Sequence, residues 1–380
     1  MRPSEREPES RTLPPIWLSV VVAVFFGGLV ALRMDPGVLE PALDGGNDFL
    51  AFYAGAKLGG TPDLYNPEKA REIQLGSAGM VGERLLFIRL PYFALFLKPL
   101  GMLPYKTAYL VWQIANVAAL VGFLALWKAT PPKLTVALAC CLAPALVSCL
   151  INGQDVFFLL LWIGLTARLL ALNRPVAAGL VLSLCLQKYH LFALAPLWIV
   201  GQRRWRAGVG VCAGAAGLLA LSFVGAGWSW PVEYLRVLSA PAIHPGVEVM
   251  PNIHGLASMD GFPFGFEVLL VALVAAAVWY VCRHGSEDYA MCATLAGGLL
   301  VSWHAYPADA SLLIPAAAIL LHKSSCRPTR ILTFICVFPM THVLFKRGVF
   351  PFDHVLHLSM LGMIAAMLIE VRRFRNPPTR

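Results

Sequence analysis

Long apolar runs recur along the whole of this 380-residue chain, and they constrain its fold more than any motif does. Several windows of roughly twenty residues carry few or no charged side chains, and that is the length a helix needs to cross a bilayer. Hydrophobic residues make up 58% of the chain and charged residues only 13%, which is far too apolar for a soluble domain. The sequence therefore predicts an all-α polytopic membrane protein with about 11–12 membrane helices.

Basic residues stand mainly in the short segments between the apolar runs. The net charge of +9 would suggest a nucleic-acid partner in a soluble chain, but this placement is typical of cytoplasmic loops, so no nucleic acid is implied. Three arginines precede the first expected span, 16–32, and no small-residue cleavage site follows it. We therefore expect cytoplasmic tails at 1–15 and 372–380 around a single transmembrane domain at 16–371.

Two long polar segments, 33–104 and 228–264, are expected on the extracytoplasmic side. Within the first, the apolar stretch 85–97 is short and contains Arg89, so it is interpreted as an interfacial or half-inserted helix. Such a loop suits an enzyme that meets a lipid-borne substrate at the membrane surface. It suits equally a cap that packs over the helix bundle, and the sequence leaves both interpretations open.

A hairpin within the membrane is predicted between Arg174 and Arg203. Both flanks are basic and therefore expected in the cytoplasm, yet only about thirty residues separate them, too few for two full spans. We expect two short helices that meet at residues 187–190, partway through the bilayer. Lys188 would be costly there unless it lines a cavity or meets an anion, which makes it a functional candidate. The alternative is a single helix from which Lys188 snorkels to the interface.

Asp48 is the first candidate for a catalytic base. It follows the first apolar run, where the chain first emerges on the outer side, and a carboxylate there can accept a proton from a substrate hydroxyl. A structural alternative stands beside this hypothesis. Asp is a favoured N-cap residue, and Asp48 could simply cap a helix that begins at Phe49.

Further polar residues are expected on the same outer side as Asp48. The set offers a cation for phosphate and histidines that can act as bases or bind anions; it comprises Asn47, Gln154, Asp155, Lys188, His190, His304, Tyr306 and Asp309. No HExxH motif is present, and the pair His354 and His357 is more typical of an interfacial helix start than of a metal site. Nine cysteines without a CxxC pair predict neither a disulfide framework nor structural zinc.

Four stretches, in order along the chain, resemble glycosyltransferase family 87. They are GGNDFLAFYAGAKLGGTPDLYNP, LPYFALFLKPLGMLPYKTAYLVWQIANV, the segment from NGQDVFF to GQRRWR, and HAYPADASLLIPA. The resemblance runs from about Asn47 to Pro315, and its most specific pieces are the Asp of the first outer loop, the Gly-Gln turn and the hairpin Lys. Members of this family are integral membrane glycosyltransferases of the GT-C type, mannosyltransferases among them, that use polyprenyl-phosphate sugars.

The resemblance implies a GT-C-type helix bundle and a reaction. A mannose-like hexose or a pentose would pass, with inversion, from a polyprenyl-phosphate donor to a lipid or glycan acceptor. The site would face the extracytoplasmic side of the inner (plasma) membrane, in contact with membrane lipids and without a cofactor or metal. Asp48 would be the base with His304 assisting, and the donor phosphate or substrate would contact Lys188, His190, Arg89, Gln154, Asn47, Tyr306 and Asp309.

Two residues depart from the family pattern. Asp155 stands where many relatives have Asn or Ser, and Tyr189 stands where Pro often follows the hairpin Lys, so the donor or acceptor could differ from that of the mannosyl members. Two alternatives remain: a transporter or flippase of a lipid-linked sugar, and an enzyme of the O-antigen ligase or polymerase type with a pyrophosphate-linked glycan donor. Transporters commonly show repeated halves, and this sequence shows no internal repeat.

Overall fold

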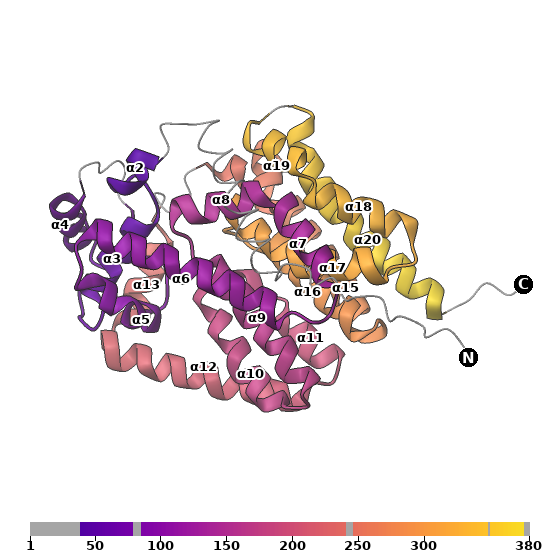
Figure 1. Cartoon of the computed structure of the whole chain (residues 1–380), viewed down its shortest axis with the longest axis horizontal. Helices are drawn as coiled ribbons and strands as arrows, with labels where there is room; N and C mark the ends of the chain where they lie inside the picture. The colour runs from indigo at the N-terminus through magenta and orange to yellow at the C-terminus, as the bar shows by residue number, and fades with distance from the viewer. Residues whose placement is uncertain (1–38, 79–84, 241–245, 349, 376–380) are drawn as a thin grey trace, which may run out of the picture.

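The computed structural model describes residues 39–78, 85–240, 246–348 and 350–375. Every regular element in these ranges is a helix, which confirms the predicted all-α class (Figure 1). The expected first span, 16–32, and the expected tail at 1–15 lie outside the described residues.

Short helices from the two predicted outer loops pack together into a unit that we call the cap. It consists of α2 (Leu39–Leu43), α3 (Phe49–Leu58), α4 (Pro67–Ser77), α5 (Pro91–Gly101) and α13 (Trp230–Leu238), which gather at one end of the molecule in Figure 1. Helices α3 and α5 approach so closely that a Cβ atom on Gly59 would lie 2.8 Å from the Ala94 carbonyl oxygen. The first long loop is therefore a packed cap over the bundle, and its contact with a membrane surface stays a prediction. Its stretch 85–97 becomes helical only from Pro91.

The cap has its own hydrophobic cluster, in which Phe49, Phe93 and Tyr234 pack with Trp112 of α6 (Tyr105–Leu126). A second cluster fills the bundle and includes Phe123, from the other half of α6. The junction between the two clusters therefore runs past the middle of α6.

The bundle contains the remaining helices. Their bounds are α7 (Pro132–Cys141), α8 (Ala143–Asn152), α9 (Val156–Ala171), α10 (Pro175–Ser183), η1 (Leu184–Phe192), α11 (Ala195–Gly201), α12 (Trp205–Ala226), η3 (Val247–Val249), α14 (Ile253–Met259), α15 (Phe264–His284), α16 (Glu287–Val301), η4 (Pro307–Leu312), α17 (Leu313–Lys323), α18 (Arg327–Val337), α19 (Pro339–Lys346), η5 (Phe352–His354) and α20 (Val355–Arg375). Helices α16 and α17 are almost wholly buried, so they form the centre of the bundle.

Five described helical segments are long and apolar enough to cross a membrane: Tyr105–Leu126, Pro175–Phe192, Trp205–Ala226, Phe264–His284 and Phe352–Arg375. Two bent pairs, α7 with α8 and α18 with α19, raise the number to seven if each pair is one span. This supports the polytopic class; the five to seven candidates are counted in the described residues, which leave out the expected first span, 16–32. Several apolar runs form shorter helices instead, such as α9 with 16 residues and α17 with 11.

The predicted hairpin is present, with unequal arms. Helix α10 leads into η1, whose regular geometry breaks at Lys188 (φ −130°, ψ 56°), and the chain returns through the seven residues of α11. Arg174 and Arg206 line one cavity of about 420 Å³, so both flanks of the hairpin lie at the same end of the bundle. Helix α10 and η1 together form an 18-residue segment that continues past the break at Lys188 to Phe192.

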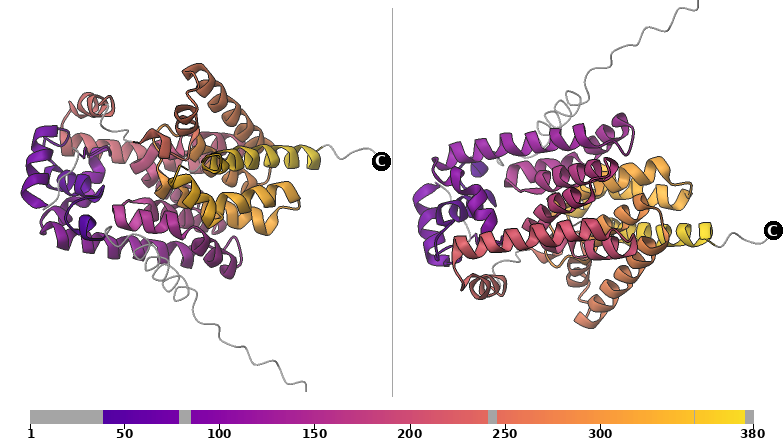
Figure 2. Two further views of the ribbon diagram at one scale, coloured as in Figure 1. Left: turned by 90° about the horizontal axis from the view of Figure 1, so that it is seen from above. Right: turned by 90° about the horizontal axis from the view of Figure 1, so that it is seen from below.

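The basic turns between helices share that end, which we call the basic end. Lys128, Arg168 and Lys323 line one cavity there together with Glu287 and Asp288. Helix α6 runs from the cap to this end, as Figure 2 shows, so the cap and the basic end lie at opposite ends of the molecule. The arrangement agrees with the distribution of basic residues that the positive-inside rule requires.

Candidate active site

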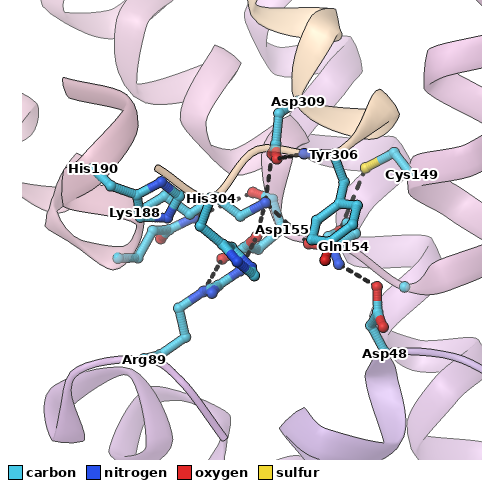
Figure 3. Close-up of polar contacts among 12 residues, drawn as sticks. Asp48, Arg89, Cys149, Gln154, Asp155, Lys188, His190, His304, Tyr306 and Asp309 are labelled. Carbon is cyan, nitrogen blue, oxygen red and sulfur yellow. Dashed lines mark hydrogen bonds and ion pairs between the residues drawn. The ribbon is translucent and has the colours of Figure 1, made fainter. Parts of the chain in front are cut away.

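Segments that are far apart in the sequence meet where the cap joins the bundle (Figure 3). The cap contributes Asp48, directly before α3, and Arg89, directly before α5; the bundle contributes Gln154 and Asp155 between α8 and α9, Lys188 in η1, and Asp309 in η4. We call these six residues the polar cluster. Five of them were predicted from the sequence as site residues, and Asp155 was expected among the polar residues of the outer side and as a departure from the family pattern.

The turn that carries Gln154 and Asp155 is held against α3. Gly153 ends α8 in the left-handed conformation (φ 63°, ψ 33°), which favours glycine. The Gly153 carbonyl oxygen accepts a hydrogen bond from Trp112 Nε1 at 2.8 Å, and a Cβ atom at this position would lie 2.6 Å from the Phe49 Cβ. Because the turn sits this close to Phe49, the Gln154 side chain reaches the neighbouring Asp48.

Lys188 lies at the centre of the polar cluster. Its ammonium group contacts Asp309 Oδ1 at 2.6 Å, Gln154 Oε1 at 3.0 Å and Asp155 Oδ1 at 3.3 Å. Gln154 and Asp309 accept hydrogen bonds from two of its N–H groups, and Asp155 forms an ion pair with the same ammonium group. The side chain is only 4% exposed and does not snorkel, which removes that alternative.

Asp155 binds a second buried cation. Arg89 donates through Nε to Asp155 Oδ2 at 3.2 Å and through Nη2 to Oδ1 at 3.3 Å. Gln187 Nε2 donates to the Asp155 backbone oxygen at 3.2 Å. The carboxylate thus bridges Arg89 of the cap and Lys188 of the hairpin. From the sequence, Asp155 was expected on the outer side, beside Gln154, without a role of its own.

Gln154 links Lys188 to Asp48. Because Oε1 faces the ammonium group, the Gln154 amide must turn its Nε2 toward Asp48, and it donates to Asp48 Oδ2 at 2.5 Å. The Asp48 side chain makes no hydrogen bond to the α3 backbone, so the capping interpretation does not describe its contacts. Burial raises the pKa of the Asp48 carboxyl above its usual value, although the Gln154 hydrogen bond and the positive charges of Lys188 and Arg89 act in the opposite direction.

The charges of the polar cluster do not balance. Two cations, Arg89 and Lys188, face the carboxylates of Asp155, Asp309 and Asp48. Asp155 and Asp309 form the direct ion pairs, and Asp48 reaches Lys188 only through Gln154. Asp48 is therefore the carboxylate of the cluster that has no direct ion pair and is best suited to accept a proton.

Aromatic side chains stand beside the polar cluster. The His190 ring lies 5.8 Å from His304, and His304 lies 5.0 Å from Tyr306, measured between ring centroids. His190 Nδ1 is 2.9 Å from Ser302 Oγ, while the Tyr306 backbone N–H donates to Asp309 Oδ2 at 2.8 Å. Burial raises the pKa of the Tyr306 phenol, with a further rise from Asp48, Asp309 and Glu248. The phenol is therefore neutral near pH 7 and can donate a hydrogen bond to a substrate oxygen.

Asn47 makes its side-chain hydrogen bonds within the cap and to α6. Its Nδ2 donates to the Ala42 carbonyl oxygen, and its Oδ1 accepts from the Tyr105 hydroxyl at 3.2 Å. Both ends of the amide thus hold α2 and α6 to the start of α3. A role in binding substrate stays a prediction for this residue.

All nine cysteines are free thiols. Within the described ranges, no group of three or more His, Cys, Asp or Glu side chains is arranged to hold a metal ion. That the reaction proceeds without a metal stays a prediction.

Comparison with known proteins gives one match. The family model for glycosyltransferase family 87 matches residues 87–307, more than half of the chain. Arg89, Gln154, Asp155 and Lys188 lie inside the matched range, whereas Asp48 and Asp309 lie outside it. No curated protein and no solved structure matches the chain.

Proposed function

Because this chain belongs to glycosyltransferase family 87, we propose that it transfers a hexose or pentose from a polyprenyl-phosphate donor to a lipid or glycan acceptor. Membership of this family, together with the long apolar helices, identifies the chain as a membrane glycosyltransferase. The proposal adds the donor class, the inverting mechanism, and a site on the extracytoplasmic side of the inner membrane. The position of the cap, opposite the basic end, supports that sidedness.

One observation supports the mechanism most strongly: Asp48 is the unpaired carboxylate of the polar cluster, oriented by Gln154. With Oδ2 engaged by Gln154, Oδ1 is the atom that would take the proton. The acceptor hydroxyl would attack the anomeric carbon from the face opposite the phosphate. A bond forms between that carbon and the acceptor oxygen, the bond to the phosphate oxygen breaks, and the hydroxyl proton passes to Asp48. The anomeric configuration inverts in this single displacement.

The departing polyprenyl phosphate needs positive charge and hydrogen-bond donors. We assign this role to Lys188, supported by Arg89, His190, His304 and Tyr306 at the edge of the polar cluster. Two of the three Lys188 N–H groups donate hydrogen bonds, to Gln154 and Asp309, so the third can donate to a phosphate oxygen while the ion pair with Asp155 stays in place.

The proposal is tested by incubating the purified full chain in detergent with a polyprenyl-phosphate hexose and a lipid-extract acceptor. Consumption of the donor with release of polyprenyl phosphate is the expected result. The Asp48→Asn variant serves as the matched inactive control. An intact donor would favour the transporter alternative, and turnover of a pyrophosphate-linked glycan alone would favour the ligase or polymerase alternative.

A further inference from the structure

Asp155 takes no part in the proton transfer just described, yet no charged side chain in the described part of the chain is more deeply buried. We infer that Asp155 is a positioning residue, which directs the Lys188 ammonium group and, through Gln154, the catalytic Asp48. The inference rests on the proposed function for its catalytic consequence, but its effect on anion binding can be measured separately.

The Asp155 carboxylate is held in a fixed orientation by Arg89. Both of its oxygens accept from the same guanidinium, which is the two-point geometry that restricts rotation of a carboxylate. Arg89 is itself anchored, since the Tyr65 hydroxyl donates to its backbone oxygen at 2.7 Å and its guanidinium lies 5.3 Å from the centroid of the Phe52 ring. A rigid cap element therefore sets where Asp155 Oδ1 points.

Asp155 also holds the break in η1 where Lys188 lies. Its backbone oxygen accepts a hydrogen bond from Gln187 Nε2, and its side chain forms an ion pair with the Lys188 ammonium group at 3.3 Å. Non-helical backbone of this kind interrupts the regular hydrogen bonds of the helix, so outside contacts must fix its conformation. Two consecutive residues of the break are thus tied to one residue of the turn between α8 and α9.

The contact with Asp155 determines what the rest of the ammonium group can do. The Asp155 carboxylate forms an ion pair with the ammonium group, and two N–H groups donate hydrogen bonds, the first to Asp309 and the second to Gln154. The second of these holds Gln154 with Nε2 toward Asp48. If the ammonium group rotated away, the Gln154 amide could flip, and its oxygen would then face the Asp48 carboxylate. Such a flip would remove the hydrogen bond that orients the base.

Asp155 has a second effect, on charge. It neutralises Arg89, and Asp309 neutralises Lys188, so the direct ion pairs leave no net positive charge for a phosphate. Removing the Asp155 charge would release one positive charge into a buried site. Anion binding should therefore tighten in the same variant in which the base is misplaced. A residue that only held the cap against the bundle would not combine tighter anion binding with slower turnover.

The test uses the full-length protein in lipid nanodiscs and the variant Asp155→Asn. Polyprenyl phosphate is the binding probe, and a polyprenyl-phosphate hexose is the substrate. We expect the probe to bind several-fold more tightly and kcat to fall by about tenfold or more, since small displacements of a reacting group have effects of this size. Asp44→Asn is the matched control, because Asp44 forms an exposed ion pair with Lys106 elsewhere in the cap.

Asp155→Glu keeps the charge and covers the case in which the Asn variant does not fold. It should leave probe affinity near that of the wild type and still lower kcat, because the longer side chain displaces the carboxylate. Unchanged kcat and affinity in both variants would overturn the inference, as would weaker binding that only follows a loss of thermal stability.

If the wild type turns over no such donor, the proposed function fails, whereas tighter probe binding by Asp155→Asn would still support the effect of Asp155 on anion binding.

Discussion

Gln154 Nε2 lies 2.5 Å from Asp48 Oδ2, although 106 residues separate the two in the sequence. The contact joins the cap to the bundle at the position of the proposed base. It also makes the chemistry of Asp48 depend on Lys188, because that ammonium group fixes which end of the Gln154 amide faces the carboxylate.

Replacing Gln154 should change the pH dependence of the reaction. The Gln154 hydrogen bond lowers the pKa of Asp48, so Gln154→Ala should raise that pKa further above the usual carboxyl value. The base must be ionised to accept a proton, and a higher pKa means that ionisation needs a higher pH. The acid limb of the kcat/KM profile should therefore move to higher pH.

Gln202→Ala is the control for this profile. Gln202 donates from the basic end to the backbone oxygens of Cys282 and Gly285, remote from Asp48. Its removal should leave the acid limb in place. An acid limb that stays fixed in Gln154→Ala, or moves to lower pH, would show that Gln154 does not act on the base.

Lys188→Ala should weaken donor binding. Loss of a hydrogen bond from a charged group costs on the order of 2–3 kcal/mol, so the dissociation constant should rise by about thirty- to a hundredfold. Lys188→Arg should retain part of the affinity if charge is what matters. Isothermal titration or a competition assay with polyprenyl phosphate measures both variants.

Lys188→Ala also leaves Asp155 and Asp309 without their shared cation, so part of any loss could reflect instability. The double variant Lys188→Met with Asp309→Asn removes one positive and one negative charge together and is the control for folding. Weak binding in a double variant of normal thermal stability would support the phosphate role. Normal donor affinity in Lys188→Ala would exclude it.

Topology is tested by cysteine labelling in intact cells. In a chain with its native cysteines replaced, cysteine at 174 or 203 should react only with reagent that reaches the cytoplasm. Cysteine at 229, beyond the other end of α12, should react from outside, because that helix runs from the basic end to the cap. Labelling of position 203 from outside would contradict the proposed orientation and the sidedness of the site.

Much of this architecture could be predicted from the sequence, because it depends on local patterns. Apolar length gives the helical membrane class, and basic flanks give the hairpin with Lys188 inside it. The number of full spans could not be predicted in the same way. Apolar runs broken at residues such as Leu142, between α7 and α8, form short or bent helices whose lengths depend on packing.

The polar cluster shows the same limit. Composition and spacing identified Asp48, Lys188 and Asp309 as polar residues where the chain is otherwise apolar, but not which of them pair. Those pairings join residues 66 to 121 positions apart, so they depend on the tertiary fold and cannot be predicted from local sequence patterns. Asp155 was expected as an outer-side polar residue that departs from the family pattern, whereas the structure gives it two cationic partners.

The central claim is that Asp48 is the catalytic base, and the rate of sugar transfer by Asp48→Asn tests it most directly. Asn keeps the shape of the side chain and can still meet Gln154 but cannot accept the proton. Turnover should fall by about two orders of magnitude or more while folding and donor binding survive. Asp44→Asn and Asp63→Asn, altered at other acids of the cap, should stay active. An Asp48→Asn enzyme as active as the wild type, with either control inactive instead, would contradict the account.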